Sequence, residues 1–187
     1  MSVYDLKPRF QDLLRPLCRR LAGGGVTANQ VTVLAVVLSG LCGGLVLGFS
    51  GARWTLLAVP AVLFVRMALN AIDGMLAREH NMRTRVGAVL NELGDVVSDT
   101  AVYLPLAVVP GMPALLLALV VALAVISEMT GVVAVQIGAS RRYDGPMGKS
   151  DRALVFGILA FLLGGGMRGA AWLTWVWATA ASLLVVT

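Results

Sequence analysis

The feature that most constrains the fold of this chain is a series of long apolar segments separated by short polar ones. These apolar segments lie at 31–49, 54–72, 88–109, 113–138, 153–166 and 170–187. Each is long enough, or nearly so, to cross a bilayer core of about 30 Å as a helix. Backbone groups in lipid must be satisfied within their own segment, and no stretch has the pattern of barrel strands. The sequence therefore predicts an all-α integral membrane protein with six transmembrane helices.

The composition and the placement of charge agree with this architecture. The chain is 58% hydrophobic and 13% charged, whereas a soluble domain carries roughly 25% charged residues. The net charge of +5 comes from clusters between apolar segments, which argues against nucleic-acid binding. Three clusters lie on one predicted side: Lys7, Arg9, Arg15, Arg19 and Arg20; Arg78, Arg83 and Arg85; Arg141, Arg142, Lys149 and Arg152.

The basic residues of the loops on the opposite side are only Arg53 and Arg168. By the positive-inside rule, this asymmetry predicts a multi-pass protein of the cell (inner) membrane with both termini in the cytoplasm. The whole chain, 1–187, is predicted to form a single membrane domain. It comprises an arm at 1–25 and a six-helix bundle at 31–187.

In the N-terminal arm, apolar residues recur every three or four positions, between basic ones. This pattern predicts an amphipathic helix at the membrane interface, with a cytoplasmic helix packed on the bundle as the alternative. The glycines at 23–25 are expected to end that helix, and Thr27 or Asn29 to cap the next one. The spacing of Cys18 and Cys42 fits no metal or redox motif, so free thiols are expected.

Within the segment 70–99, carboxylates that lie in otherwise apolar sequence are Asp73, Glu92, Asp95 and Asp99. Carboxylates at membrane depth are costly, and by default they indicate a functional site that faces the bundle interior. Asn70 and Asp73 are three residues apart, and Asn91, Asp95 and Asp99 repeat every four residues, so each set shares a helix face. Oxygen ligands that converge between two helices suit a hard divalent cation such as Mg²⁺ or Mn²⁺.

Small residues and one cation accompany these carboxylates. Gly74 and Ala77 are close together on one helix, and Gly87 opens the next, so a backbone or a flat ligand can approach closely. Arg78 adds a fixed positive charge. Together with a metal, these residues favour a phosphate-bearing ligand over a bare ion.

The segment 70–95 reads Asn70-x2-Asp73-Gly74-x2-Ala77-Arg78-x8-Gly87-x3-Asn91-x3-Asp95. It resembles the signature of the CDP-alcohol phosphotransferase family, D-x2-D-G-x2-A-R-x8-G-x3-D-x3-D, with the same spacing and six of eight residues matched. Upstream, the segment 27–32, TANQVT, is similar to the family's Pro-Asn-x2-Thr entry to the first span. The six predicted spans and the amphipathic arm also resemble this family.

The resemblance implies the transfer of a phosphatidyl or phosphoalcohol group from a CDP-activated donor to an alcohol, with release of CMP. We expect CDP-diacylglycerol as the donor, and an unspecified alcohol as the acceptor. Membrane lipids and a second copy of the chain, in a homodimer, are the other expected partners. The implied metal ligands are Asn70, Asp73, Asn91 and Asp95; the implied nucleotide-binding residues are Gly74, Ala77, Arg78 and Gly87; and the implied base is Asp95, with Asp99 as the alternative.

Two positions depart from the family signature, because its first and third aspartates are Asn70 and Asn91 here. An Asn side chain coordinates a metal through its carbonyl oxygen but contributes no negative charge. Three explanations follow: weaker or single-metal binding, a rearranged ligand set that includes Asp99 or Glu92, or a member that has lost catalysis.

The segment 141–152 is a second basic region on the predicted cytoplasmic side. Its cations Arg141, Arg142, Lys149 and Arg152 are candidates for binding a phosphorylated acceptor or the donor's phosphates. The alternative is a positive-inside loop that touches anionic lipid. Glu128, within the fourth predicted span, is expected to pair inside the bundle, with Arg66 as one candidate partner.

Two other functions compete with the transferase. An ion- or proton-coupled transporter also has intramembrane acids, but such acids are expected throughout the bilayer depth, and internal repeats are not apparent. Here Asp73, Glu92 and Asp95 cluster toward the cytoplasmic side, which favours a surface-accessible enzyme site. A catalytically impaired member that binds CDP-lipid is the second alternative, and the two Asn replacements favour it.

Overall fold

The computed structural model describes residues 6–139, 145–167 and 171–187, and this part of the chain is helical apart from turns and short connections, as predicted. The elements in chain order are α1 (Leu6–Gly23), α2 (Ala28–Gly48), α3 (Arg53–Glu79), α4 (Arg85–Tyr103), the 3-10 helix η2 (Leu104–Val108), α5 (Ala114–Gln136), α6 (Lys149–Gly164) and α7 (Ala171–Val186).

Local sequence explains where several helices begin and end. The predicted end of the arm is confirmed, since α1 stops at Gly23 and Gly25 adopts a positive φ of 78°. Thr27, rather than Asn29, caps α2: its hydroxyl accepts from the backbone N–H of Gln30, whose side chain accepts from the N–H of Thr27. The reciprocal bonds satisfy two N–H groups that the first helical turn leaves without partners.

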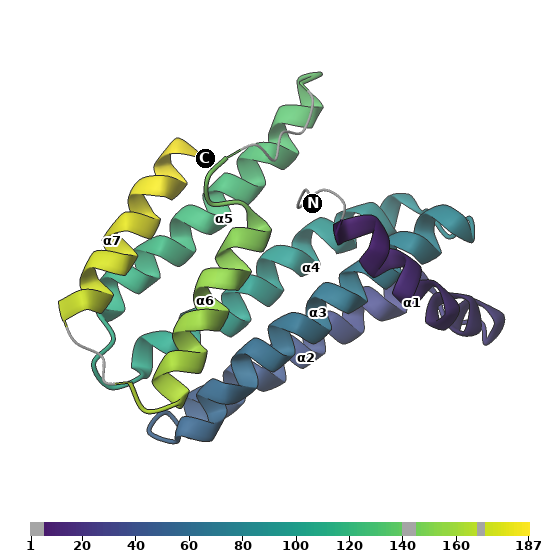
Figure 1. Ribbon diagram of the computed structural model, residues 1–187. Helices are drawn as coiled ribbons and strands as arrows, with labels where there is room; N and C mark the ends of the chain where they lie inside the picture. Colours follow the sequence, from purple (N-terminus) through teal and green to yellow (C-terminus); the bar gives the residue numbers. More distant parts are fainter. Residues whose placement is uncertain (1–5, 140–144, 168–170) are drawn as a thin grey trace.

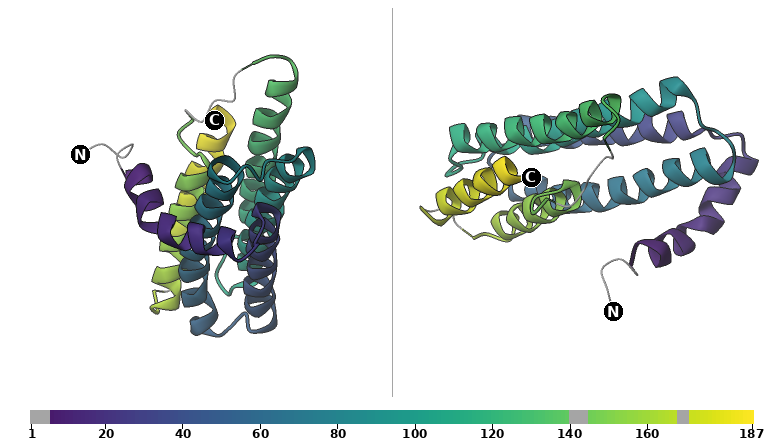
Figure 2. Two further views of the ribbon diagram at one scale, coloured as in Figure 1. Left: turned by 90° about the vertical axis from the view of Figure 1, so that its right-hand side faces the viewer. Right: turned by 90° about the horizontal axis from the view of Figure 1, so that it is seen from above.

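The helices after α1 form an elongated bundle (Figure 1). α2 packs against both α3 and α4, α3 packs against α6, and α5 packs against α7. The connection from α2 to α3, the start of α5 and the end of α6 lie together at one end of the bundle, at the lower left of Figure 1. α1 packs against α3 and runs across the long axis of the other helices (Figure 2, left).

Three helices in the described part of the chain are long and apolar enough to cross a membrane: α2, α3 and α5. α4 carries several charged residues, and α6 and α7 have 16 residues each. A helix of that length rises about 24 Å, which is short of a full bilayer core. The number of six spans therefore stays a prediction.

Two clusters of buried side chains hold the bundle together. The larger joins most of the helices and contains the stacked rings of Tyr103 and Phe156, with Trp177 of α7 against Phe156. The smaller lies where α1 meets α2 and α3, and its centre includes Cys18 and Met75, both fully buried. The expectation of free thiols is confirmed.

The attachment of α1 leaves part of its apolar surface uncovered. Arg15 forms an ion pair with Glu79 at the end of α3, at 3.1 Å, and the ring of Phe10 contacts that of Phe64 edge-on. Leu13 remains 75% exposed and Leu17 47% exposed. An apolar face of this kind suits a membrane surface, so the interfacial position of α1 stays a prediction that the structure accommodates.

Candidate active site between α2, α3 and α4

The signature residues lie on two helices that are joined through a third. α3 carries the motif from Asn70 to Arg78, and α4 carries it from Gly87 to Asp95. Both helices pack extensively on α2, whereas direct contact between α3 and α4 is sparse. α2 therefore forms the floor of a groove, with α3 and α4 as its walls.

An open pocket of about 710 Å³ occupies this groove and extends to the end of α5. That volume is within the range of about 300–1,000 Å³ that is usual for small-molecule sites. α2 contributes Ala28, Asn29 and Thr32 to its lining. The sequence-predicted residues that line the pocket are Asp73, Gly74, Ala77, Arg78, Gly87, Asn91 and Glu92.

Asp73 is buried at the base of this pocket, with 5% of its surface exposed. The Thr32 hydroxyl donates to its Oδ2 at 2.9 Å and lies 3.2 Å from the backbone oxygen of Ala28. A buried carboxylate needs such donors, because an unsatisfied buried charge is strongly unfavourable. The described part of the chain contains no ion pair to Asp73, so this carboxylate faces the pocket without a protein cation bound to it.

Two glycines of the motif make room for neighbouring polar groups. A Cβ atom at Gly74 would lie 3.1 Å from the guanidinium nitrogens of Arg78, so the Arg78 side chain lies against this position. A Cβ at Gly87 would lie 2.5 Å from Oδ1 of Asn29, on α2. The backbone N–H of Gly87 donates to the Thr84 hydroxyl at 2.8 Å, and this hydrogen bond caps the start of α4. Larger residues at either position would displace these polar groups from the pocket wall.

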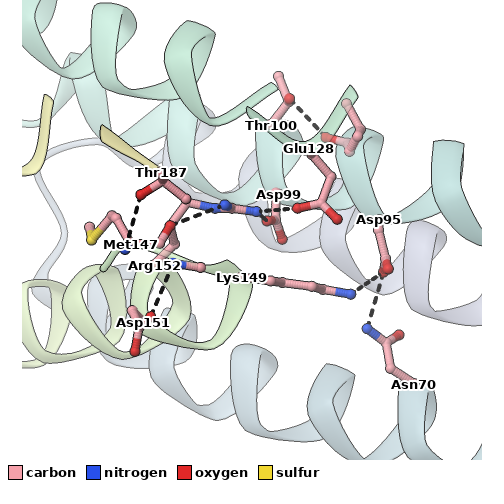
Figure 3. Close-up of polar contacts among 12 residues, drawn as sticks. Asn70, Asp95, Asp99, Thr100, Glu128, Met147, Lys149, Asp151, Arg152 and Thr187 are labelled. Carbon is pink, nitrogen blue, oxygen red and sulfur yellow. Dashed lines mark hydrogen bonds and ion pairs between the residues drawn. The ribbon is translucent and has the colours of Figure 1, made fainter. Parts of the chain in front are cut away.

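Asp95 lies deeper along α4 and is contacted from two other helices (Figure 3). The Asn70 amide nitrogen donates to its Oδ1 at 3.1 Å, from α3. The ammonium group of Lys149, at the start of α6, forms an ion pair with the same oxygen. The structure thus brings together three sequence-predicted residues that are far apart in the chain.

Beyond Asp95, a buried network of charged side chains joins four helices. Arg66 of α3 pairs with Oδ1 of Asp99 at 2.8 Å, and Arg152 of α6 approaches Oδ2 of Asp99 at 3.5 Å. Arg152 also pairs with Glu128 of α5 at 2.8 Å and donates to the backbone oxygen of Met147 at 3.3 Å. Arg66 and Arg152 are 4% and 2% exposed. The mutual pairing of these charges offsets the cost of burying them.

This network corrects one expectation and locates others. Glu128 pairs with Arg152, and Arg66 pairs with Asp99 instead of Glu128. Asp99 and Arg152 lie outside the lining of the large pocket; with Asp95 they line a small internal cavity of about 10 Å³. The predicted phosphate-binding residues Arg141 and Arg142 lie outside the described residues.

The oxygen donors near the pocket fit a hard divalent cation. Asp73 and Asp95 offer carboxylates, and Asn70 and Asn91 offer amide oxygens, which are the ligand types that Mg²⁺ and Mn²⁺ prefer. Among the described residues, no three His, Cys, Asp or Glu side chains lie close enough to hold an ion by themselves. The donor set therefore fits an ion that takes its remaining ligands from water or from a bound phosphate, as Mg²⁺ commonly does.

The sequence assigned Thr32 no individual role beyond its place in the resemblance at 27–32, and it indicated Asn29 only as a candidate helix cap. Both line the pocket from α2, and Thr32 holds Asp73. The sequence feature that could have indicated Thr32 was its polar side chain in the largely apolar segment that forms α2. Pairing it with Asp73 required knowledge of how α2 and α3 pack.

Comparison with known proteins identifies the family that the signature resembles. The family model described as CDP-alcohol phosphatidyltransferase matches residues 25–186. The inner membrane protein YnbA of Escherichia coli is 46% identical over 187 residues, covering 100% of this chain and 92% of YnbA. The phosphatidylinositol phosphate synthase of Mycobacterium bovis is 35% identical over 94 residues, which are 50% of this chain and 42% of the synthase.

A solved structure has the same fold. The crystal structure of the Mycobacterium tuberculosis phosphatidylinositol phosphate synthase, with CDP-DAG bound, superimposes with a TM-score of 0.73. The alignment covers 91% of this chain and 85% of the synthase, at 21% sequence identity. At that identity the likeness establishes a shared arrangement of helices.

Proposed function

The chain belongs to the CDP-alcohol phosphatidyltransferase family, and we propose that it transfers a phosphatidyl group from CDP-diacylglycerol to an acceptor alcohol. The family and its structural neighbour support a membrane-embedded transferase of phospholipid synthesis. CDP-diacylglycerol is the donor we favour, because the structural neighbour binds CDP-DAG in the same fold. The reaction releases CMP.

The observation that carries this proposal is the 710 Å³ pocket lined by the motif residues of both α3 and α4. Its walls provide a buried carboxylate at Asp73, a guanidinium at Arg78 and close backbone approach at Gly74 and Gly87. These groups suit a nucleoside diphosphate: the guanidinium pairs with phosphate oxygens, and the small residues admit a flat base. The apolar surfaces around the groove suit the acyl chains.

The family is generally dependent on divalent metals, and Asp73, Asp95, Asn70 and Asn91 are the residues that would hold such an ion here. An ion held by these residues would supply positive charge to offset that of the donor's phosphates. In the proposed step, the acceptor oxygen forms a bond to the phosphorus that bears the lipid, CMP leaves with its electron pair, and Asp95 takes the hydroxyl proton. Asp99 is a poorer base than Asp95, because two buried arginines, Arg66 and Arg152, pair with its carboxylate, whereas Asp95 pairs with the more exposed Lys149.

The test is the binding of CDP-diacylglycerol to the detergent-purified protein, with Mg²⁺ or Mn²⁺ and then with a chelator. We expect metal-dependent binding that falls at least about tenfold in Asp73→Asn, which keeps the size of the side chain but removes its charge. Asp12→Asn is the matched control, because Asp12 is an exposed carboxylate on α1, away from the pocket.

Two outcomes would count against the donor site. Folded wild-type protein that binds no CDP-diacylglycerol under any metal condition would rule out this donor, and repeating the titration with CDP would identify a different CDP-linked one. Equal affinities in Asp73→Asn and Asp12→Asn would place the donor elsewhere.

A second candidate function is that of a CDP-lipid-binding member without transferase activity. Asn70 and Asn91 favour it, because they remove two negative charges from the ligand set. Release of CMP from CDP-diacylglycerol across a panel of acceptor alcohols separates the two candidates. Donor binding with no CMP release from any acceptor would support the second one.

The same proposal includes the side of the membrane on which the site lies and the oligomeric state of the protein. We expect the pocket and both termini on the cytoplasmic side of the inner membrane, and a homodimer as the assembled form. The ion pair between Arg15 and Glu79 supports the first point, since it places the basic arm beside the pocket end of α3.

A further inference from the structure

The two carboxylates of the proposed site have different surroundings. Asp73 lines the open pocket, and its side-chain partner is the neutral hydroxyl of Thr32. Asp95 lies outside the pocket lining, and its Oδ1 is contacted by both the Asn70 amide nitrogen and the Lys149 ammonium. Figure 3 shows Lys149 reaching from α6 toward Asp95, with the Asn70 amide nitrogen directed at the same oxygen. One carboxylate is therefore open to a ligand, while a protein cation already neutralises the other.

We propose that this site binds a single divalent cation, on the side of Asp73 and Asn91, and that the Lys149 ammonium is a fixed positive charge on the side of Asp95. The inference rests on the proposed function, and it specifies how the site neutralises the donor's phosphates. It also gives Asn70 and Asn91 a physical role, because neither side chain adds negative charge to the site. The carboxylates at the site are Asp73 and Glu92, which line the pocket, and Asp95, which is paired with Lys149. The two that are not paired with Lys149 offset the charge of one divalent ion, and the protein lacks the negative charge to hold two.

The position of Lys149 is well defined by the structure around it. The first turn of α6 is fixed by the Asp151 side chain, which accepts from the backbone N–H of Gly148 at 3.0 Å. One turn along the helix, the buried Arg152 pairs with Glu128 and donates to the Met147 carbonyl. These contacts fix the first turn of α6, which packs on α3, and tie it to Glu128 of α5, so that Lys149 reaches Asp95.

Electrostatics explains why Lys149 and a second metal ion exclude each other. An ammonium and a divalent cation that share one carboxylate would lie within a few ångströms of each other, in surroundings of low dielectric. Like charges at that separation repel more strongly in a partly buried site than in water. The Asn70 side chain strengthens this arrangement, because it presents its N–H₂ donor, and not its oxygen, to Asp95.

The experiment counts bound Mn²⁺ per chain by electron paramagnetic resonance, on detergent-purified full-length protein with saturating CDP. CDP binding is measured by calorimetry on the same samples. We expect one tightly bound Mn²⁺ in the wild type. In Lys149→Met with Asn70→Asp and Asn91→Asp, we expect a second Mn²⁺ that binds at least about tenfold more tightly than any second ion of the wild type.

Arg85→Met is the matched control, because Arg85 is an exposed cation at the start of α4 that does not line the pocket. This variant should leave the number of tightly bound Mn²⁺ ions per chain at one. Two tight Mn²⁺ ions in the wild type, with CDP bound, would overturn the inference and leave the proposed function standing. A triple variant that still binds CDP but only one Mn²⁺ would also overturn it. Folded wild-type protein that binds neither CDP nor Mn²⁺ would contradict the proposed function itself.

Discussion

At the scale of single residues, the contact between Thr32 and Asp73 is the most informative. Thr32 lies on α2, 41 residues before Asp73, and is itself 7% exposed. Its hydroxyl supplies a hydrogen bond that stabilises a carboxylate at the base of the pocket without neutralising it. A cation in this place would compete with a bound metal, whereas a hydroxyl leaves the charge of Asp73 available to a ligand.

Replacement of Thr32 by Val should lower the affinity for CDP-diacylglycerol about tenfold and destabilise the protein by about 1–3 kcal/mol, because Asp73 loses a buried donor. Thr32→Ser should retain most of both properties. The measurements are donor titration and thermal unfolding in detergent.

Ser39→Ala is the control for the Thr32 variants. Ser39 is fully buried on the same helix, but its hydroxyl donates to the Ala35 backbone oxygen within α2. Loss of donor affinity in Ser39→Ala equal to that in Thr32→Val would show that the effect comes from α2 as a whole.

At the scale of elements, the close packing of α2 on α4 sets the depth of the groove. A Cβ atom at Gly43 would overlap the backbone oxygen of Ala101 on α4. Nearer the pocket, a Cβ at Gly94 would lie 3.2 Å from the Thr32 side chain. Small residues at these positions let the two backbones approach, as is common where helices pack within membranes. The close approach keeps Thr32 beneath the signature residues of α4.

Gly43→Ala should therefore force α2 and α4 apart and destabilise the protein by about 1–3 kcal/mol, the usual cost of overpacking a close contact. Gly44→Ala is an adjacent control, because a Cβ at that position has no heavy atom of another residue within 4 Å. Thermal unfolding of both variants tests this prediction. Equal midpoints would show that the α2–α4 contact tolerates a methyl group.

At the scale of the whole molecule, the bundle has two different ends. The basic arm, the motif residues and Lys149 are connected at one end by the contacts of Arg15 with Glu79 and of Lys149 with Asp95. The short connection between α2 and α3 lies at the other end (Figure 1). Positive charge concentrated at the pocket end favours a cytoplasmic position for that end.

Cysteine labelling in intact cells tests this orientation. With a membrane-impermeant maleimide, Gly51→Cys in the α2–α3 connection should react from outside, and Arg20→Cys on α1 only after permeabilisation. The reversed pattern would invert the proposed topology. The native thiols should give little background because Cys18 and Cys42 are 0% and 3% exposed. Burial also raises the pKa of the Cys18 thiol, which lowers the fraction of reactive thiolate at neutral pH.

Much of the site could be predicted from sequence because its residues are local to two helices. The spacing of three and four residues placed Asn70 with Asp73, and Asn91 with Asp95, on common faces. The expected pairing of Glu128 within the bundle is confirmed, but Arg66, its one candidate partner, pairs with Asp99, since a helical repeat does not show which other helix lies opposite. Arg152, 24 residues away, is the actual partner.

By itself, the sequence determined the helical class of the chain, the end of α1 at its glycines and the spacing of the family signature. These depend on local rules, in which apolar runs, capping side chains and helical periodicity act within a few residues. Only the tertiary structure decided that Thr32 supports Asp73, that Lys149 neutralises Asp95 and that two arginines hold Asp99. Each of those contacts joins different helices, and it forms because a buried charge requires a partner that only the packing of the bundle brings within reach.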